Sequence, residues 1–151
     1  MSLLGSVSLG RIVFTALALP AIRPVTHLVD GDHVVIRTDR NAAITSELRD
    51  RTGTVVAYEA DAIDMTKHLG WSVIVVGIAH RVIDPDEAAA YRQALRPWVD
   101  GTKDQVIAIH ADIVTGFRLV ADGAAAIGRA DAAAVRDEDP GLTGGGTGRR
   151  S

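Results

Sequence analysis

Residues 21–38 read AIRPVTHLVDGDHVVIRT, two apolar-rich runs that meet at Asp30-Gly31. Apolar and polar side chains alternate over much of each run, which is typical of a strand with one buried face. Asp-Gly between two such runs favours a two-residue turn, because both residues tolerate positive φ. The stretch therefore predicts an antiparallel β-hairpin.

A turn at Asp30-Gly31 fixes the register of this hairpin, with Val29 opposite the residue after Gly31. Counting back from the turn, Arg23 faces Thr38, with their Cβ atoms about 5 Å apart on one face. An arginine beside a hydroxyl group, next to the free backbone N–H groups at the start of the helix after Asp39, forms a suitable phosphate site. A solvated strand arginine is the alternative interpretation, and the hairpin alone leaves both open.

The period-two pattern extends over most of the chain and is broken by short turn-rich segments. It predicts six strands, the last of them long enough to bend or to form two strands. Their expected bounds are residues 11–17, 21–29, 33–38, 54–61, 71–82 and 105–120. The chain is therefore expected to be mainly β and mostly antiparallel.

Two short helices are expected to interrupt the strands. Asp84 as N-cap, Pro85 at the first helical position and Glu87 three residues after the cap predict a helix over residues 84–97, with Tyr91 and Leu95 on its apolar face. A helix over residues 41–50 has a weaker apolar stripe, Ile44 and Leu48. Trp98 falls just beyond the end of the helix over residues 84–97.

Residues 1–120 are expected to form one domain, in which Met1-Ser2-Leu3 is interpreted as partly a leader. Residues 121–151 are rich in Ala and Gly and end in a Gly-Thr-Gly stretch with no apolar face to bury, so we expect a flexible tail.

Composition excludes several classes of function. The chain has 151 residues, a formal net charge of −3 and no cysteine. An acidic chain without a basic run before Arg149 is not expected to bind nucleic acid. Apolar stretches are shorter than a membrane span, and no secretory signal is present, so we expect a cytoplasmic protein with no membrane contact. Without cysteine, redox chemistry requires a bound cofactor.

Five short stretches, taken in order and spacing, resemble the pyridoxamine 5′-phosphate oxidase-like family of flavin-binding split barrels, and most closely its small actinobacterial-type members. The resemblance implies a six-stranded antiparallel split β-barrel that binds FMN between the two subunits of a homodimer. It also implies an oxidoreductase acting on a small-molecule substrate. The matching stretches are residues 10–14, 22–27, 35–38, 70–77 and 115–118.

The resemblance assigns the phosphate and ribityl end of FMN to Arg23, Arg37 and Thr38. The family's next phosphate contact is a lysine where the following helix opens, and here Asn41 and two alanines stand in its place. One lost charge-assisted contact is worth about 1.5–3 kcal/mol, so FMN affinity is expected to fall roughly ten- to a hundredfold unless Arg37 or Arg40 substitutes.

The flavin ring is expected beside Trp71 and Ser72, with His27 in hydrogen-bonding reach. Trp71 has a second interpretation as a core or interface anchor. Arg118 either reaches a flavin on the partner subunit or is a solvated charge. No side chain is assigned as a dedicated catalyst, because the flavin itself carries the hydride.

Two other functions remain open. Similar split barrels use the deazaflavin F420, which would suit an altered phosphate site. A barrel that binds flavin, haem or another ligand without turnover, as a sensor or carrier, is the third possibility. The five histidines lack metal-ligand spacing, so no metal is expected. Glu59, Asp61 and Asp64 are interpreted as a solvated turn.

Overall fold

The structure is a computed structural model that describes residues 1–48, 53–95 and 104–121. Six strands account for most of them, each close to a run that the sequence predicts. A short 3₁₀ turn, η1 (Leu4–Ser6), precedes the first strand. The strands are β1 (Leu9–Ala16), β2 (Leu19–Asp30), β3 (His33–Thr38), β4 (Thr54–Asp64), β5 (Leu69–Arg81) and β6 (Gln105–Leu119).

The strands form one closed ring in the order β1-β2-β3-β6-β5-β4, with every neighbouring pair antiparallel. The predicted six-stranded antiparallel barrel is therefore confirmed. β6 is a single strand, and it passes a bulge where Asp112 is an extra residue opposite Val76 and Gly77. The bulge increases the local bend, so one strand serves both the barrel and the sheet that extends beyond it.

The predicted register of the β2–β3 hairpin is wrong. Asp30 pairs with His33 and His27 with Ile36, so the turn residues are Gly31 and the aspartate after it. Gly31 has φ 58°, the conformation that a type II′ turn requires at its first central position. The turn therefore lies one residue later than predicted.

Both helices form, and both are shorter than predicted. α2 (Pro85–Ala94) lies outside the ring, and Asp84 caps it by accepting from the backbone N–H groups of Asp86 and Glu87 at 3.0 and 2.8 Å. α1 (Ala43–Glu47) lies near one end of the ring. The predicted ends at residues 50 and 97, and Trp98, lie outside the described residues.

Two apolar clusters hold these elements together. As predicted, α2 packs through Leu95 and the partly buried Tyr91, over Val35 and Ala108 on the outside of the barrel. The inward side chains of the ring form the main core. Leu4 from η1, and Ile44 and Leu48 in and just after α1, also belong to this core. Its members include Ile12, Val34, Ile36, Ile44, Leu48, Tyr58, Val75, Ile107 and Ile109.

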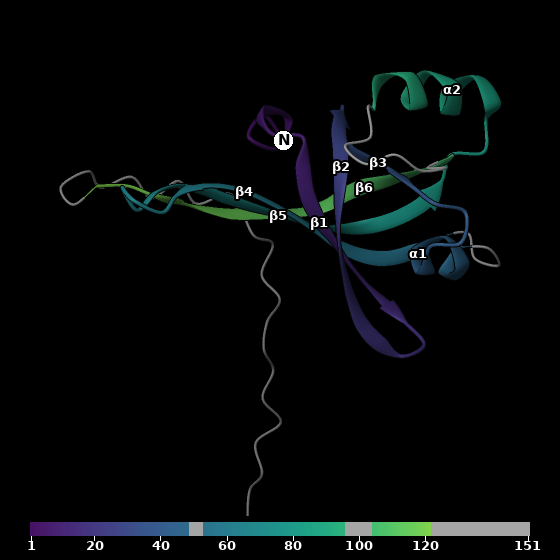
Figure 1. Ribbon diagram of the computed structural model, residues 1–151, viewed down its shortest axis with the longest axis horizontal. Coiled ribbons are helices and arrows are strands. Elements are labelled where there is room, and N and C mark those ends of the chain that lie inside the picture. The colour runs from purple at the N-terminus through teal and green to yellow at the C-terminus, as the bar shows by residue number, and fades with distance from the viewer. Residues whose placement is uncertain (49–52, 96–103, 122–151) are drawn as a thin grey trace, which may run out of the picture.

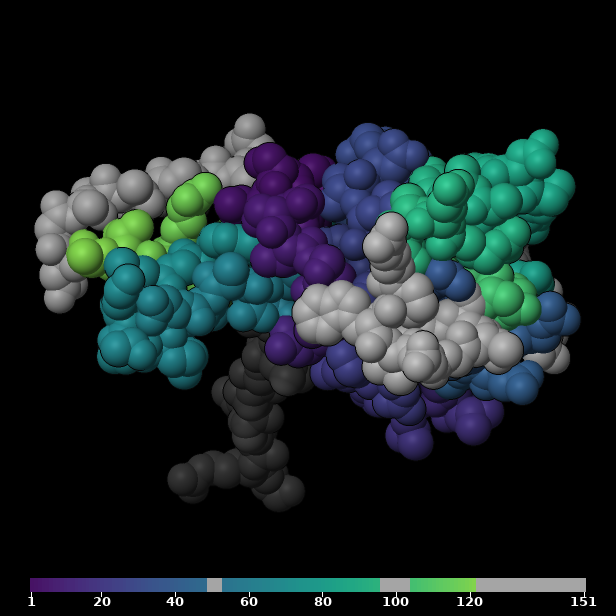
Figure 2. All heavy atoms as spheres, turned by 45° about the horizontal axis from the view of Figure 1, so that its top comes forward, coloured from purple at the N-terminus to yellow at the C-terminus, as the bar shows by residue number. Residues whose placement is uncertain are grey.

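The ends of β4, β5 and β6 extend beyond the barrel as a three-stranded arm, residues 60–73 and 116–119 (Figures 1 and 2). The arm forms because β1 pairs with β4 only at residues 11–13 and 57–59. We call the side of β4–β6 that continues the barrel exterior the outer face. Ser72 lies on it, and Trp71 lies on the inner face.

Residues 122–151 lie outside the described residues, so the predicted tail remains a prediction. Within the described ranges, no helix has the length and apolar character needed to cross a membrane. Met1 and Leu3 pack against the main core.

Gly77 provides a test of the bulge. A methyl group at Gly77 would meet the backbone carbonyl oxygen of His110 across the β5–β6 pair. We expect Gly77→Ala to lower the free energy of unfolding in urea by about 1–3 kcal/mol through overpacking. Gly5→Ala is the matched control, since an added Cβ there meets no heavy atom within 4 Å. Equal losses in the two variants would contradict the bulge geometry.

Candidate functional site

The structure separates the two residues that the hairpin was expected to bring together. Arg23 pairs with Ile12 of β1, and its guanidinium donates to the backbone oxygen of Ile22 at 2.7 Å on the protein surface. Thr38 is buried and pairs with Gln105 of β6. The Arg23–Thr38 pair that follows from the predicted register is therefore not formed.

Arg37 lies against the C-terminal end of α2. Its Nη1 donates to the backbone oxygens of Arg92 and Leu95 at 2.9 and 2.8 Å, which satisfies carbonyls that lack a partner within the helix. This nitrogen therefore fastens α2 to the barrel. Asn41, exposed in the segment before α1, has no charge to replace the family's lysine.

His27 lies in a buried hydrogen-bond chain. Its Nε2 is 2.9 Å from the backbone oxygen of Leu4, which can only accept, so Nε2 carries the proton and Nδ1 accepts from the Tyr58 hydroxyl at 2.7 Å. Burial lowers the pKa of His27 and raises that of Tyr58. The neutral imidazole joins η1, β2 and β4, and both of its nitrogens are occupied.

Trp71 and Ser72 point to opposite faces of β5. Trp71 belongs to the main core cluster and pairs with the exposed Arg118 of β6 on the inner face. Ser72 donates through its Oγ to Glu59 Oε1 at 3.1 Å on the outer face. The geometry supports the packing interpretation of Trp71 and leaves Ser72 as the polar group facing outward.

Arg11 organises the charges around Ser72. Its Nη1 lies 2.9 Å from Glu59 Oε2 and 2.9 Å from Asp61 Oδ1, and these hydrogen bonds raise the pKa of Arg11. Glu59 and Asp61 therefore lie within β4 and bind an arginine, so the prediction of a solvated turn is wrong for both. It holds for Asp64, which accepts from the two backbone N–H groups that follow at positions 66 and 67.

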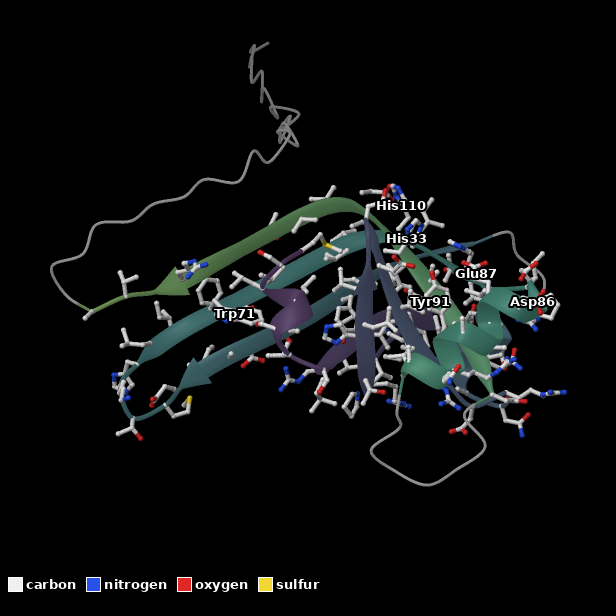
Figure 3. The ribbon with its side chains drawn as sticks, turned by 90° about the horizontal axis from the view of Figure 1, so that it is seen from above. His33, Trp71, Asp86, Glu87, Tyr91 and His110 are labelled. Atoms are coloured by element: carbon white, nitrogen blue, oxygen red, sulfur yellow. The ribbon has the colours of Figure 1, made fainter. Side chains whose placement is uncertain are left out.

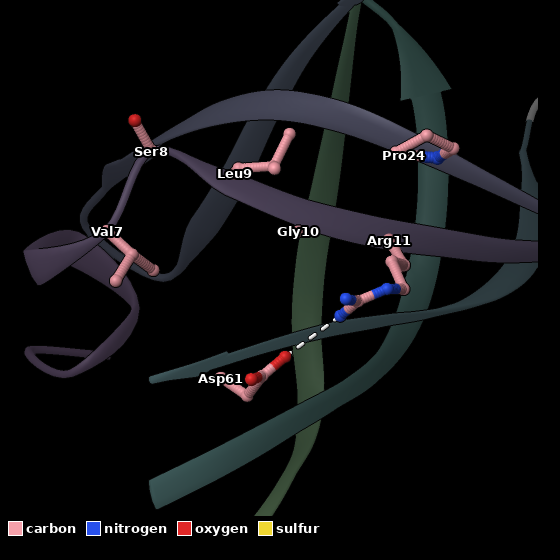
Figure 4. A pocket seen from close by; sticks show the side chains of 7 residues that line it. All are labelled: Val7, Ser8, Leu9, Gly10, Arg11, Pro24 and Asp61. Carbon is pink, nitrogen blue, oxygen red and sulfur yellow. Dashed lines mark hydrogen bonds and ion pairs between the residues drawn. The ribbon is translucent and has the colours of Figure 1, made fainter. Parts of the chain in front are cut away.

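A cavity of about 400 Å³ opens beside this cluster (Figure 4). The ion pair of Arg11 with Asp61 forms part of its wall, and apolar and backbone groups form the rest. A ligand there would meet one guanidinium, one carboxylate and apolar surface. The lining residues are Val7, Ser8, Leu9, Gly10, Arg11, Pro24 and Asp61.

A second cavity, of about 440 Å³, is lined by Arg40, Thr45, Arg81 and Gln105. Its walls come from the segment before α1, from α1 itself and from the ends of β5 and β6. We call it the Arg40–Arg81 cavity. The sequence did not predict this polar cavity, because its residues come together only through the pairing of strands that are far apart in the sequence.

Histidines from three strands meet on the outside of the barrel (Figure 3). The rings of His33 and His80 make an edge contact, as do those of His33 and His110. Asp32 lies 2.7 Å from His33 Nδ1 and 3.1 Å from His110 Nε2, and Asp112 lies 2.8 Å from His110 Nδ1. Within the described ranges, no group of three or more such side chains is arranged to hold a metal ion.

The closed antiparallel ring, the outer helix and the sheet that extends beyond the ring define a split β-barrel. The family model for pyridoxamine 5′-phosphate oxidase matches residues 1–120, so the chain belongs to this family, as its motifs predict.

Relatives and solved structures agree with this family. A protein of Mycobacterium tuberculosis, Rv0080, is 51% identical over 124 residues, which cover 81% of this chain and 82% of that one. The FAD binding protein from Mycobacterium smegmatis is 31% identical, with a TM-score of 0.62 over 78% of this chain and 90% of that one. A conserved protein of unknown function from Corynebacterium diphtheriae is 30% identical, with a TM-score of 0.63 over 79% and 91%.

The position of His27 predicts a loss of stability in acid. The unfolded chain protonates His27 near pH 6.5, whereas burial keeps the folded group neutral to lower pH. Its contribution is therefore complete above pH 6.5 and is lost as the pH falls toward the folded pKa, by up to about 1.4 kcal/mol per pH unit.

Urea unfolding of the wild type, His27→Asn and His68→Asn between pH 7.5 and 5 measures this contribution. We expect His27→Asn to reduce the loss of stability in acid, and His68→Asn to keep it, because His68 is exposed. The same pH dependence in all three proteins would contradict the neutral buried imidazole.

Proposed function

We propose that this chain binds a flavin nucleotide and acts as a pyridoxamine 5′-phosphate oxidase-like oxidoreductase on a small molecule. The observation that carries the proposal is the similarity to a protein described as FAD binding. The two chains are 31% identical, and the match covers 90% of the FAD binding protein. Family membership over residues 1–120 supports it independently.

The outer face of the arm fits a flavin ring. Ser72 offers a hydroxyl in a buried position, and Phe117, its direct partner on β6, is 55% exposed and offers an aromatic surface. Arg11 and Glu59 complete a polar border beside them. When bound, the flavin supplies the hydride chemistry, and these residues bind the ring, orient it and tune its surroundings.

The homodimer is part of the proposal. The strand pairing places a set of large exposed apolar side chains on the outer face of β4–β6, next to Ser72. A second copy of the chain would cover this surface and enclose the ring between two subunits. The set is Val55, Ile74, Ile78, Ile113, Phe117 and Leu119.

FMN is the flavin that the motifs indicate, and the FAD of the M. smegmatis relative gives FAD equal standing. F420 and a non-catalytic flavin or haem carrier are the other outcomes of the tests below. Bound flavin that anaerobic nicotinamide reductant does not bleach would favour the carrier.

Titration with FMN, FAD and F420, followed by cofactor fluorescence, tests the proposal. We expect binding of FMN or FAD. Ser72→Ala should weaken it about tenfold, because one hydrogen bond near the ring is lost. Ser6→Ala is the control, since it also removes a hydrogen-bonded hydroxyl, but in η1. Binding of F420 alone, or of no cofactor, contradicts the flavin proposal.

Light scattering tests the dimer. We expect the wild type to be a dimer at micromolar concentration and Ile113→Asp to be a monomer, because the substitution puts a charge into the apolar outer face. Leu17→Asp changes a residue that is 91% exposed in the β1–β2 turn and should leave the dimer intact. A monomeric wild type contradicts the assembly.

A further inference from the structure

We propose that the cavity beside Arg11, which we call the Arg11 cavity, binds a small protonated amine with an apolar body. The inference rests on the proposed function, because it names the class of substrate that the oxidoreductase takes. It is carried by the place of the cavity next to Ser72, by the excess of negative charge in its wall and by one unused carboxylate oxygen.

The Arg11 cavity lies where β1 and β4 diverge. Their pairing ends at Arg11 opposite Glu59, and the next outward residue of β4, Asp61, does not pair with β1. Asp61 is the direct partner of Ser72 on β5, so their Cβ atoms lie about 5 Å apart on the outer face. A ligand in the cavity would therefore border a flavin ring held at Ser72.

The charges in the wall of the cavity favour a cation. The side chains of Arg11 and Asp61 form an ion pair in this wall (Figure 4). The same Nη1 of Arg11 also binds Glu59, so one guanidinium faces two carboxylates, and one negative charge is in excess. This excess repels a phosphate or carboxylate ligand and attracts an ammonium group.

Asp61 keeps one oxygen for a ligand. Both oxygens of Glu59 already accept a hydrogen bond, Oε1 from Ser72 and Oε2 from Arg11. In Asp61, Oδ1 accepts from Arg11, and no group within the described segments donates to Oδ2. An ammonium group supplies both the missing donor and a positive charge, which makes the hydrogen bond stronger than one between neutral groups.

The rest of the wall suits an apolar body. Val7, Leu9 and Pro24 provide aliphatic surface, and Gly10 adds backbone without a side chain. The volume of about 400 Å³ falls within the range of small-molecule sites. The cavity therefore fits a compact apolar amine and not a phosphate ester.

Titration with benzylamine, benzyl alcohol and benzoate tests the preference for charge, because the three probes share one ring and differ in charge. Nuclear magnetic resonance of the ¹⁵N-labelled protein at pH 7 follows binding. We expect benzylamine to bind and to shift the amide signals of Gly10 and Arg11. Benzyl alcohol should bind about tenfold more weakly, and benzoate more weakly still.

Asp61→Asn tests the unused oxygen, because it removes the charge and keeps the shape of the side chain. The Asp61 side chain is 31% exposed, so its contact lies between a buried and a surface one. We expect benzylamine binding to weaken about tenfold. Asp64→Asn is the matched control: it removes the same charge from the same strand outside the cavity and should leave the affinity unchanged.

Three outcomes overturn the inference: the wild type does not bind benzylamine, benzoate binds as tightly as benzylamine, or Asp61→Asn binds benzylamine as well as Asp64→Asn does. Thermal unfolding checks that Asp61→Asn remains folded, as expected because Arg11 keeps its ion pair with Glu59.

The same titrations with and without added FMN or FAD separate this inference from the proposed function. If the wild type binds no flavin, the proposed function fails, and benzylamine binding that Asp61→Asn weakens still supports the amine site. If Asp61→Asn loses as much affinity for flavin as for benzylamine, the cavity belongs to the flavin and the inference is overturned.

Discussion

The barrel depends on a short junction between β1 and β4, in which residues 11–13 pair with residues 57–59. These three pairs close the ring, whereas β4 and β5 pair over eleven residues. The junction is reinforced on both sides. Inside, Ile12 and Tyr58 are fully buried, and Tyr58 donates to His27. Outside, Arg11 binds two carboxylates of β4.

The shortness of this junction determines where ligands can bind. Past it, no strand within the described residues pairs with the free edge of β4, so the arm leaves the barrel and exposes an outer face that carries Ser72 and Phe117. A longer junction would continue the barrel and remove the cavity beside Arg11, whose wall includes residues from both strands. Closure over three pairs therefore gives a stable core and an open sheet in one small chain.

Local sequence patterns predicted the strands because a period of two reports a strand without knowledge of its partner. They failed in the hairpin because Gly31 can be either the second or the first residue of a two-residue turn, and both choices preserve the alternation. They missed the Arg40–Arg81 cavity for another reason. Gln105 and Arg81 become neighbours of Thr38 only through the β3–β6 and β5–β6 pairings, which a single sequence does not reveal.

The buried hydrogen bonds of His27 could not be predicted from the sequence either, because its two partners, Leu4 and Tyr58, are 23 and 31 residues away in the chain. By contrast, the sequence correctly predicted from Asp84 and Glu87 where α2 begins, because capping involves only residues a few positions apart in the sequence.

The charge of the chain restricts how an anionic cofactor can be held. A formal charge of −3 repels a flavin phosphate at long range, and salt screens this repulsion beyond about 8 Å. Attraction must therefore come from cations within contact distance. At the outer face, Arg11 is paired with two carboxylates, Glu59 and Asp61, so this cluster offers no net positive charge to a phosphate. At the barrel end, Arg81 has no carboxylate partner within the described residues. The outer face and the barrel end therefore differ in the charge that they present to an anionic group.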